Sequence, residues 1–167
     1  DSTLRGHYPL ETELLARAEE KHRGRAVDGE IICPYFKEGG RFTIGNVHYV
    51  KYGNELIPAG ETEFAEDKTF GYHCSNLKEY VEEKTGGRYP AREVLDVSLE
   101  ELRSLDYAAI TNKLLALHDF GKIVVNAVDA CDLKVFCIAL YDAMNQGRRF
   151  MFRTAAGFVK EFGAIRE

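Results

Sequence analysis

The order of apolar and polar positions along the chain predicts strands that alternate with helices. Short apolar runs typical of strands occupy residues 29–33, 93–97 and 122–128, and a fourth covers residues 149–152. Between these runs, apolar residues recur at intervals of three and four, which is helical spacing. The alternation predicts a single α/β domain with an open, mostly parallel sheet and helices on both faces.

Residues that favour helix ends mark where the helices begin and stop. The first helix is expected over residues 9–23, where Leu10, Leu14, Leu15 and Ala18 have helical spacing and Gly24 follows as a terminator. The N-caps expected for later helices are Ser75, Ser98 and Asp132. Ser98 also has Glu101 three residues later, the spacing of a capping box. Residues 153–158 are expected to turn into a terminal helix.

Two segments interrupt the alternation. Residues 44–58 carry Gly53-Asn54 between two short strand-like runs, which predicts a β-hairpin insertion. Residues 34–43 follow the first strand and contain Gly39-Gly40, so we expect a loop there. Such a loop either lets the backbone approach a ligand, with Arg41 reaching it, or is a plain turn.

Composition narrows the class of protein. The chain has 167 residues, 45% hydrophobic and 29% charged, with a net charge of −5. It has no basic character of the kind nucleic-acid-binding proteins show, and no apolar run near the ~20 residues of a membrane span. Its four cysteines show no Cys-x-x-Cys or zinc spacing, which favours reduced thiols in a cytoplasmic protein. We expect no metal site: the acidic stretch 61–67 is interpreted as a solvated loop, and the histidines as surface or hydrogen-bonded side chains.

Candidate ligand-binding residues follow from the rule that open α/β sheets bind ligands at the carboxyl ends of their strands. The rule selects Gly40 and Arg41, Asp129 with Asp132, and Arg153 with Thr154. The opening segment Asp1-Ser2-Thr3-Leu4-Arg5-Gly6-His7 precedes the first helix and gathers polar side chains at a position that suits an anion. The alternative is that Ser2 or Thr3 only caps the helix and Arg5 is solvated.

Four stretches resemble one protein family. The opening run DSTLRGH is similar to the K-x-D-S-T-L-R-G motif of the four-carbon acid sugar kinases, and residues 34–46 (PYFKEGGRFTIGN) to that family's P-x-x-x-x-x-G-R-x-T-x-x-G stretch. Residues 128–133 match its V-D-A-x-x-x-D-L pattern within one residue. Residues 153–159 (RTAAGFV) resemble its R-T-A-A-S-F-V signature, with Gly157 where serine is usual.

The resemblance implies a function that spacing alone does not show. Members are ATP-dependent kinases that phosphorylate threonate, erythronate or 3-oxo-tetronate, with a sugar-acid-binding N-terminal domain and a separate C-terminal nucleotide domain that uses Mg²⁺. It implies that residues 1–167 are the larger part of the first domain, and that the sugar acid and the C-terminal domain are the partners. The substrate-binding residues implied are Asp1, Ser2, Thr3, Arg5, Gly6, Gly40, Arg41, Asp129, Arg153 and Thr154. The general base is either Asp1 or one of the family's aspartates upstream of Asp1.

The chain begins without methionine and inside the motif, so we expect a fragment of a longer polypeptide that is inactive alone. The family's upstream D-D-x-T-G-A strand and its downstream nucleotide domain are expected outside residues 1–167. Two other interpretations remain: a stand-alone small-acid-binding or regulatory domain, and a dehydrogenase-type nucleotide binder. The second is disfavoured because no Gly-x-Gly-x-x-Gly follows any predicted strand. The oligomeric state is open, and a homo-oligomer is one option.

Overall fold

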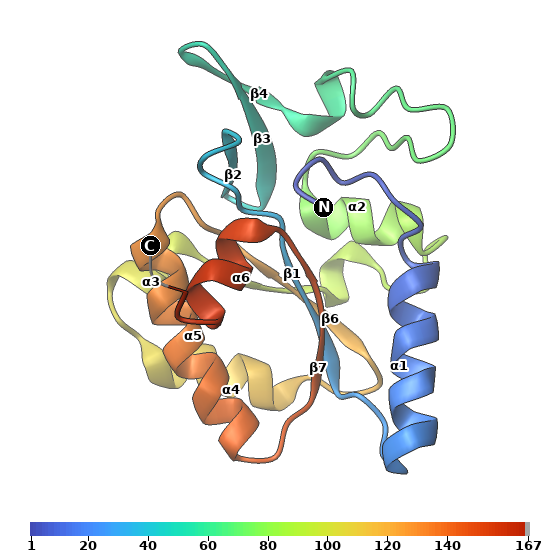
Figure 1. The fold of residues 1–167 in the computed structure, drawn as a ribbon, viewed down its shortest axis with the longest axis vertical. Helices are drawn as coiled ribbons and strands as arrows, with labels where there is room; N and C mark the ends of the chain where they lie inside the picture. The colour runs from blue at the N-terminus through green and yellow to red at the C-terminus, as the bar shows by residue number, and fades with distance from the viewer. Residues whose placement is uncertain (166–167) are drawn as a thin grey trace.

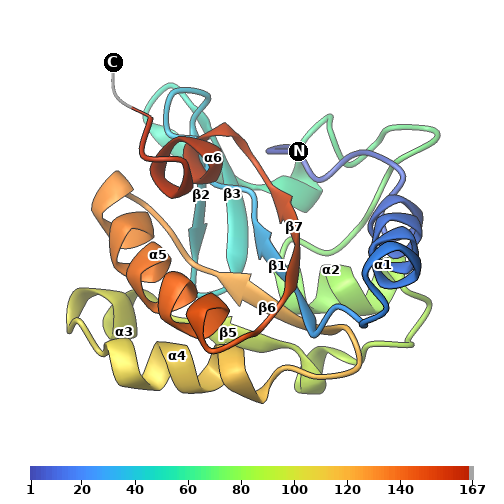
Figure 2. The same ribbon diagram turned by 60° about the horizontal axis from the view of Figure 1, so that its bottom comes forward.

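The computed structural model describes residues 1–165, which form two sheets of different kinds (Figures 1 and 2). The larger is a parallel sheet with the strand order β5-β6-β1-β7. Its strands are β1 (Gly29–Cys33), β5 (Leu95–Val97), β6 (Gly121–Val125) and β7 (Phe150–Thr154). The predicted α/β architecture, with its parallel sheet and flanking helices, is confirmed.

Helices cover both faces of this sheet, because the buried strand β1 sends alternate side chains into two cores. Ile31 and Cys33 join one core, and Ile32 joins the other. The first core is covered by α3 (Leu99–Arg103), α4 (Tyr107–Ala116), α5 (Ala130–Asn145) and α6 (Ala156–Phe162). The second face carries α1 (Leu10–Arg23) and α2 (Leu77–Lys84), seen on the right of Figure 2.

Helix α1 turns its leucines outward. It ends at Gly24, whose φ of 65° gives the left-handed terminator that the sequence predicts. Leu10, Leu14 and Leu15 are 54–57% exposed, whereas Thr12 is buried. The glutamates on either side of Thr12 form ion pairs across the fold, Glu11 with Arg153 and Glu13 with Arg88. Charge pairing rather than leucine packing therefore attaches α1.

The smaller sheet is antiparallel and extends the predicted hairpin by one strand. Its strands are β2 (Arg41–Ile44), β3 (Val47–Tyr52) and β4 (Glu55–Pro58), followed by a 3₁₀ helix at Ala59–Glu61, and a second 3₁₀ helix lies at Ala91–Glu93. The β3–β4 hairpin turns at Gly53 as predicted. The additional strand pairs through the turn Gly45-Asn46, where both residues have positive φ, 56° and 67°. Arg41 therefore begins a strand, whereas the sequence analysis expected it to lie in a loop.

Capping decides where several elements begin. The capping box of Ser98 and Glu101 is confirmed. The prediction that Ser75 caps α2 is wrong, because the Asn76 carboxamide accepts from the Lys78 amide at 3.0 Å. The Ser75 hydroxyl instead accepts a hydrogen bond from the Gly60 amide at 2.8 Å. At the other end of the chain, β7 continues through Thr154 before α6 begins.

A buried ion pair joins the two central strands. Glu30 and Lys122 are directly opposite in the β1–β6 register, with 2.8 Å between Oε2 and Nζ. Their side chains are 0% and 1% exposed, and no other described residue forms a hydrogen bond to either charged group. The Lys122 ammonium lies 3.4 Å and 4.3 Å from the ring centroids of Phe120 and Tyr89. Each charge is therefore compensated mainly by the other.

Removing one member of this pair should destabilise the protein more than removing both. We expect Glu30→Met or Lys122→Met alone to cost about 3–5 kcal/mol, because each leaves an uncompensated buried charge. The double substitution should cost less than either single one, since methionine keeps a similar volume without charge. Urea unfolding of the four proteins measures this, and additive losses in the double variant would contradict it.

Gly157 lies where α6 packs closely on the segment after β1. A Cβ atom at this position would be 2.6 Å from Tyr35 Cδ1 and 2.8 Å from the Tyr35 carbonyl oxygen. Both distances are too short for real contacts, and the second involves backbone. The structure therefore gives a packing reason for glycine at the position where the resembling family has serine.

We expect Gly157→Ser to destabilise this chain by about 1–3 kcal/mol through overpacking against Tyr35. Ala156→Ser is the control, because Ala156 is exposed on the same helix and should change stability by no more than about 0.5 kcal/mol. Chemical unfolding of both variants gives the comparison, and a Gly157→Ser protein as stable as wild type would refute the packing argument.

Candidate functional site

The carboxyl ends of β1, β6 and β7 lie at one edge of the sheet, and the N-terminal loop (residues 1–6) runs beside them. In Figure 1 the N-terminus lies between the small sheet and α2. The Asp1 nitrogen donates to the Thr154 carbonyl at 2.9 Å, which places the loop at the end of β7. The structure thus brings the opening motif to the edge that the sequence analysis selected.

Within the N-terminal loop, three candidate side chains form a continuous hydrogen-bonded chain. Asp1 Oδ1 accepts from the Thr3 amide at 2.7 Å and from the Thr3 hydroxyl at 2.9 Å. The same hydroxyl accepts from Arg5 Nε at 3.1 Å. A carboxylate, a hydroxyl and a guanidinium are therefore presented together, and none of these bonds caps α1, whose N-cap Pro9 has no side-chain hydrogen bond.

Two arginines from separate segments meet at one aromatic ring. The guanidinium carbons of Arg5 and Arg41 lie 5.0 Å and 5.3 Å from the centroid of Phe64. Arg5 Nη1 is 3.8 Å from Asp67 Oδ2, and its side chain remains 40% exposed. Hydrogen bonds from the amides of Phe70 and Thr69, with a smaller effect from Arg5, lower the pKa of Asp67. Phe64 and Asp67 come from the irregular acidic stretch, which carries no recognisable motif.

His48 lies beneath the N-terminal loop, fully buried on β3. Its Nε2 is 2.9 Å from the Ser2 carbonyl and its Nδ1 is 3.0 Å from the Thr43 hydroxyl. Because a carbonyl only accepts, Nε2 donates and neutral Nδ1 accepts from Thr43. Burial, with a contribution from the positive charge of Arg41, lowers the pKa of His48 to about 4. For His48 the prediction of a hydrogen-bonded histidine is confirmed, but the burial of His48 was not expected.

Arg153 is enclosed by partners from the start of the chain. Its side chain is 8% exposed, pairs with Glu11 and donates to the Arg5 carbonyl at 3.0 Å. Its guanidinium carbon lies 4.9 Å from the centroid of Tyr8. Of the three arginines that the sequence selects, Arg153 therefore connects β7 to the loop, while Arg5 and Arg41 share Phe64. The contacts of Glu11 and Tyr8 with Arg153 have no signal in the sequence pattern.

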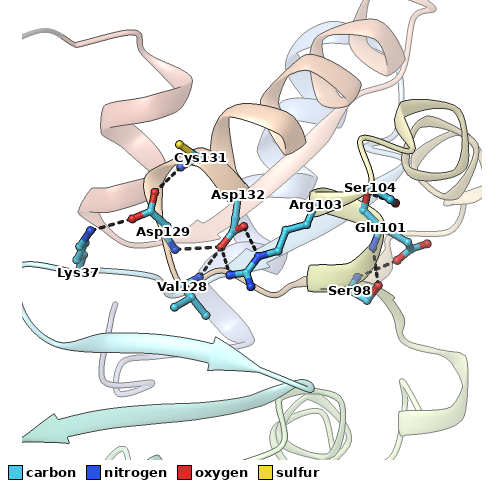
Figure 3. A network of polar contacts seen from close by, with 9 residues as sticks. All are labelled: Lys37, Ser98, Glu101, Arg103, Ser104, Val128, Asp129, Cys131 and Asp132. Atoms are coloured by element: carbon cyan, nitrogen blue, oxygen red, sulfur yellow. Dashed lines mark hydrogen bonds and ion pairs between the residues drawn. The ribbon is translucent and has the colours of Figure 1, made fainter. Parts of the chain in front are cut away.

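Asp129 and Asp132 begin α5 in a network shown in Figure 3. Asp129 is the N-cap, accepting from the Cys131 amide at 3.0 Å and from Lys37 Nζ at 2.8 Å. Asp132 completes the capping box by accepting from the Val128 and Asp129 amides, each at 3.0 Å. The expectation that Asp132 is the N-cap is wrong, because β6 ends at Val125 and the helix begins earlier.

The charge of Asp129 is well stabilised where it lies. Hydrogen bonding from the Cys131 amide, followed by that from Lys37, lowers the pKa of Asp129 to about 2. On the next turn of α5, Asp132 pairs with Arg103 at 3.2 Å. The network therefore fixes the N-terminus of α5 at the same edge of the sheet, with Lys37 reaching it from the segment after β1.

The Gly39-Gly40 pair forms a tight turn. The Gly40 amide donates to the Lys37 carbonyl at 2.9 Å, with a φ of 72° at Gly40. The amide and carbonyl of Arg41 pair with those of Phe36 at 2.8 and 3.0 Å. These contacts form a tight turn that places Arg41 at the first position of β2.

Cavities lie at both ends of the sheet. One of about 420 Å³ lies at the amino end, lined by Glu13, Arg17, Tyr89 and Phe120 among others. A smaller one of about 270 Å³ lies near the carboxyl edge, lined by Phe36, Glu38, Ala156, Gly157, Lys160 and Ile165. We assign the candidate site to the carboxyl edge, because the residues selected from the sequence gather there. The amino-end cavity is also lined by charged side chains, but by none of those residues. Across residues 1–165, no three His, Cys, Asp or Glu side chains converge to hold a metal ion.

The buried His48 should make stability depend on pH. Its folded pKa of about 4 lies below the usual ~6.5, so the unfolded chain binds a proton first as pH falls. The stability contributed by neutral His48 is complete above pH ~6.5 and is lost between pH ~6.5 and ~4, a change of about 3 kcal/mol. Urea unfolding of wild type and His48→Gln across this range tests it, and parallel profiles would contradict it.

Comparisons with known proteins bear on the family and the fold of the chain. A family model described as a sugar-binding N-terminal domain matches residues 1–162. The comparison with curated proteins gave no match. No helix within the described part of the chain has the length and apolar character needed to span a membrane.

Two solved structures share the fold. The Haemophilus influenzae protein HI1011, of the DUF1537 family, has a TM-score of 0.67 and 17% identity, with 98% of this chain and 36% of that chain covered. A Salmonella typhimurium LT2 protein described as a "putative tRNA synthase" has a TM-score of 0.68 and 17% identity, with 96% and 34% covered. This chain thus spans about a third of each. As the sequence resemblance predicted, it belongs to the family of sugar-binding N-terminal domains.

Proposed function

We propose that this chain binds the sugar-acid substrate of an ATP-dependent kinase acting on a four-carbon acid such as threonate, erythronate or 3-oxo-tetronate. The observation that carries the proposal is that the guanidiniums of Arg5 and Arg41 both lie over the ring of Phe64. Hydrogen bonds link Arg5 to Thr3 and Thr3 to Asp1 beside them. The match to a sugar-binding domain supports the ligand class.

The chemistry of the site suits a small polyhydroxy acid. The two guanidiniums offer planar donors to the carboxylate, and Asp1, Ser2 and Thr3 offer oxygen partners to the hydroxyls. In the proposal, Gly6, Gly40 and Thr154 border the ligand, while Arg153 and Asp129 hold the surrounding backbone through the contacts described above. Asp1, whose carboxylate already accepts from a hydroxyl, is the proposed general base.

The proposal assigns ATP and Mg²⁺ to a C-terminal domain of a longer polypeptide. No Gly-x-x-x-x-Gly-Lys-Ser/Thr loop occurs in residues 1–167. ATP with Mg²⁺ supplies the phosphoryl group and neutralises its charge, while the residues here hold and orient the acceptor hydroxyl. The second candidate, a small-acid-binding or regulatory domain without transfer, uses the same residues and differs only in lacking that domain.

Binding of threonate by the chain, measured by calorimetry, tests the ligand class. We expect Arg5→Ala or Arg41→Ala to weaken binding. In the complete polypeptide assayed with ATP and Mg²⁺, either change should lower kcat/KM roughly 30- to 1,000-fold, a loss of about 2–4 kcal/mol of transition-state stabilisation. Neither change should unfold the protein, because both residues are partly exposed and belong to neither hydrophobic core.

Two controls sharpen the test. Arg17→Ala removes an exposed arginine of α1 and should leave binding unchanged. Threitol, which has four carbons but no carboxylate, should bind wild type more weakly and should not respond to Arg5→Ala. Unchanged binding in both site variants would refute the proposal, and binding without transfer in the complete polypeptide would favour the regulatory candidate.

A further inference from the structure

Four consecutive carbonyl groups of the N-terminal loop accept hydrogen bonds from side chains elsewhere in the fold. The carbonyls are those of Ser2, Thr3, Leu4 and Arg5, and the donors, in the same order, are His48, Tyr72, Tyr80 and Arg153. The donor–acceptor distances lie between 2.8 and 3.0 Å. We call these four side chains the carbonyl anchors.

The carbonyl anchors come from separate parts of the chain and are themselves held in place. His48 lies on β3, Tyr72 in the segment before α2, and Tyr80 on α2, and all three are 0–2% exposed. Tyr80 packs edge-on to Tyr72 at 5.5 Å and stacks with Tyr8 at 5.6 Å. The ring packing fixes where each hydroxyl points, so the donors form a rigid template for the loop.

The loop has a backbone conformation that it would not keep unaided. Leu4 has a φ of 62°, in the left-handed region that costs a residue with a Cβ roughly 1–2 kcal/mol. Tyr72 donates to the carbonyl of Thr3 and Tyr80 to that of Leu4 itself, and these bonds hold Leu4 in place. Leu4 is 2% exposed. Strain that the surrounding structure imposes in this way is typical of functional sites.

The carbonyl anchors also determine where the ligand-facing groups lie. With the carbonyls of residues 2–5 directed to the anchors, the Thr3 hydroxyl is free to link Asp1 to Arg5, and the Arg5 guanidinium reaches Phe64. A rotation of the Thr3–Leu4 peptide would move both groups. The anchors therefore act on the ligand through the loop, because their hydrogen bonds go to the loop carbonyls and not to the side chains of Asp1, Thr3 or Arg5.

We propose that His48, Tyr72 and Tyr80 are positioning residues for the sugar-acid site, which set the geometry of Thr3 and Arg5 by holding the loop carbonyls. This inference rests on the proposed function, because the site it serves is the proposed sugar-acid site. Its content is specific: removal of one hydroxyl that donates to the loop backbone should weaken binding while the ring packing remains.

The test uses Tyr72→Phe, Tyr80→Phe and the double variant, because phenylalanine keeps the ring and removes only the donor. Tyr141→Phe is the control for loss of a tyrosine hydroxyl away from the loop: the 43% exposed Tyr141 also donates to a backbone carbonyl, that of Phe162. Backbone amide exchange of residues 3–6, followed by NMR, reports on the loop, and calorimetry with threonate reports on the site.

We expect amide exchange of residues 3–6 to accelerate in each Phe variant at the loop and not in Tyr141→Phe. Threonate affinity should fall roughly 3- to 10-fold per lost hydroxyl, the usual range for one hydrogen bond, and further in the double variant. His48→Gln keeps an N–H donor and should retain more affinity than His48→Leu. If Tyr141→Phe lowers the melting temperature as much as the loop variants do but leaves threonate affinity unchanged, lost stability alone does not explain the loss of affinity.

Two results would overturn the inference. The first is unchanged amide exchange in the double variant, which would show that the hydroxyls do not hold the loop. The second is accelerated exchange with threonate affinity within twofold of wild type, which would show that the loop position does not matter to the site. Failure of wild type to bind any tetronate would instead refute the proposed function and the inference with it, while the exchange data would still report whether the hydroxyls hold the loop.

Discussion

Side-chain hydrogen bonds to four consecutive carbonyls are the constraint on which the candidate site depends. Without its contacts to the rest of the fold, a loop with a left-handed leucine would sample many conformations, and fixing each residue costs about 1–2 kcal/mol of conformational entropy. The donors come from β3, from the segment before α2, from α2 and from β7. The loop therefore contacts the small sheet, α2 with the segment before it, and strand β7. A shift of any one of them would move the carbonyls of the loop, and with them Thr3 and Arg5.

The three candidate arginines have different roles once their partners are known. Arg153 is buried and compensated by Glu11, so its charge serves to join β7 to α1 and the loop. Arg5 is half exposed with Asp67 at 3.8 Å, and Arg41 comes to the same ring from β2. In the proposal, these two cations attract the sugar acid, an anion preference that the net charge of −5 does not indicate.

The sequence pattern predicts the strands of the parallel sheet, but not the long-range contacts that build the candidate site. Apolar runs identify β1 and β6 because a parallel strand buried on both faces has few alternatives. The hydrogen bond of His48 to Ser2 joins residues 46 positions apart, and that of Arg153 to Arg5 joins residues 148 apart. Local spacing carries no information about such pairs. The opening motif and Arg153 were selected from the sequence, whereas the anchors His48, Tyr72 and Tyr80 were not.

Helix α1 shows the same limit in a different form. Its apolar spacing correctly predicts a helix, yet periodicity cannot say which side faces the core. Ion pairs of Glu11 and Glu13 with distant arginines fix the helix with Leu10 and Leu14 outward. The ion pair of Glu11 also holds Arg153 where it donates to the Arg5 carbonyl, so it links the orientation of α1 to the geometry of the loop. A substitution that restored a conventional apolar inner face to α1 would release Arg153, and the loop would lose one of its four anchors.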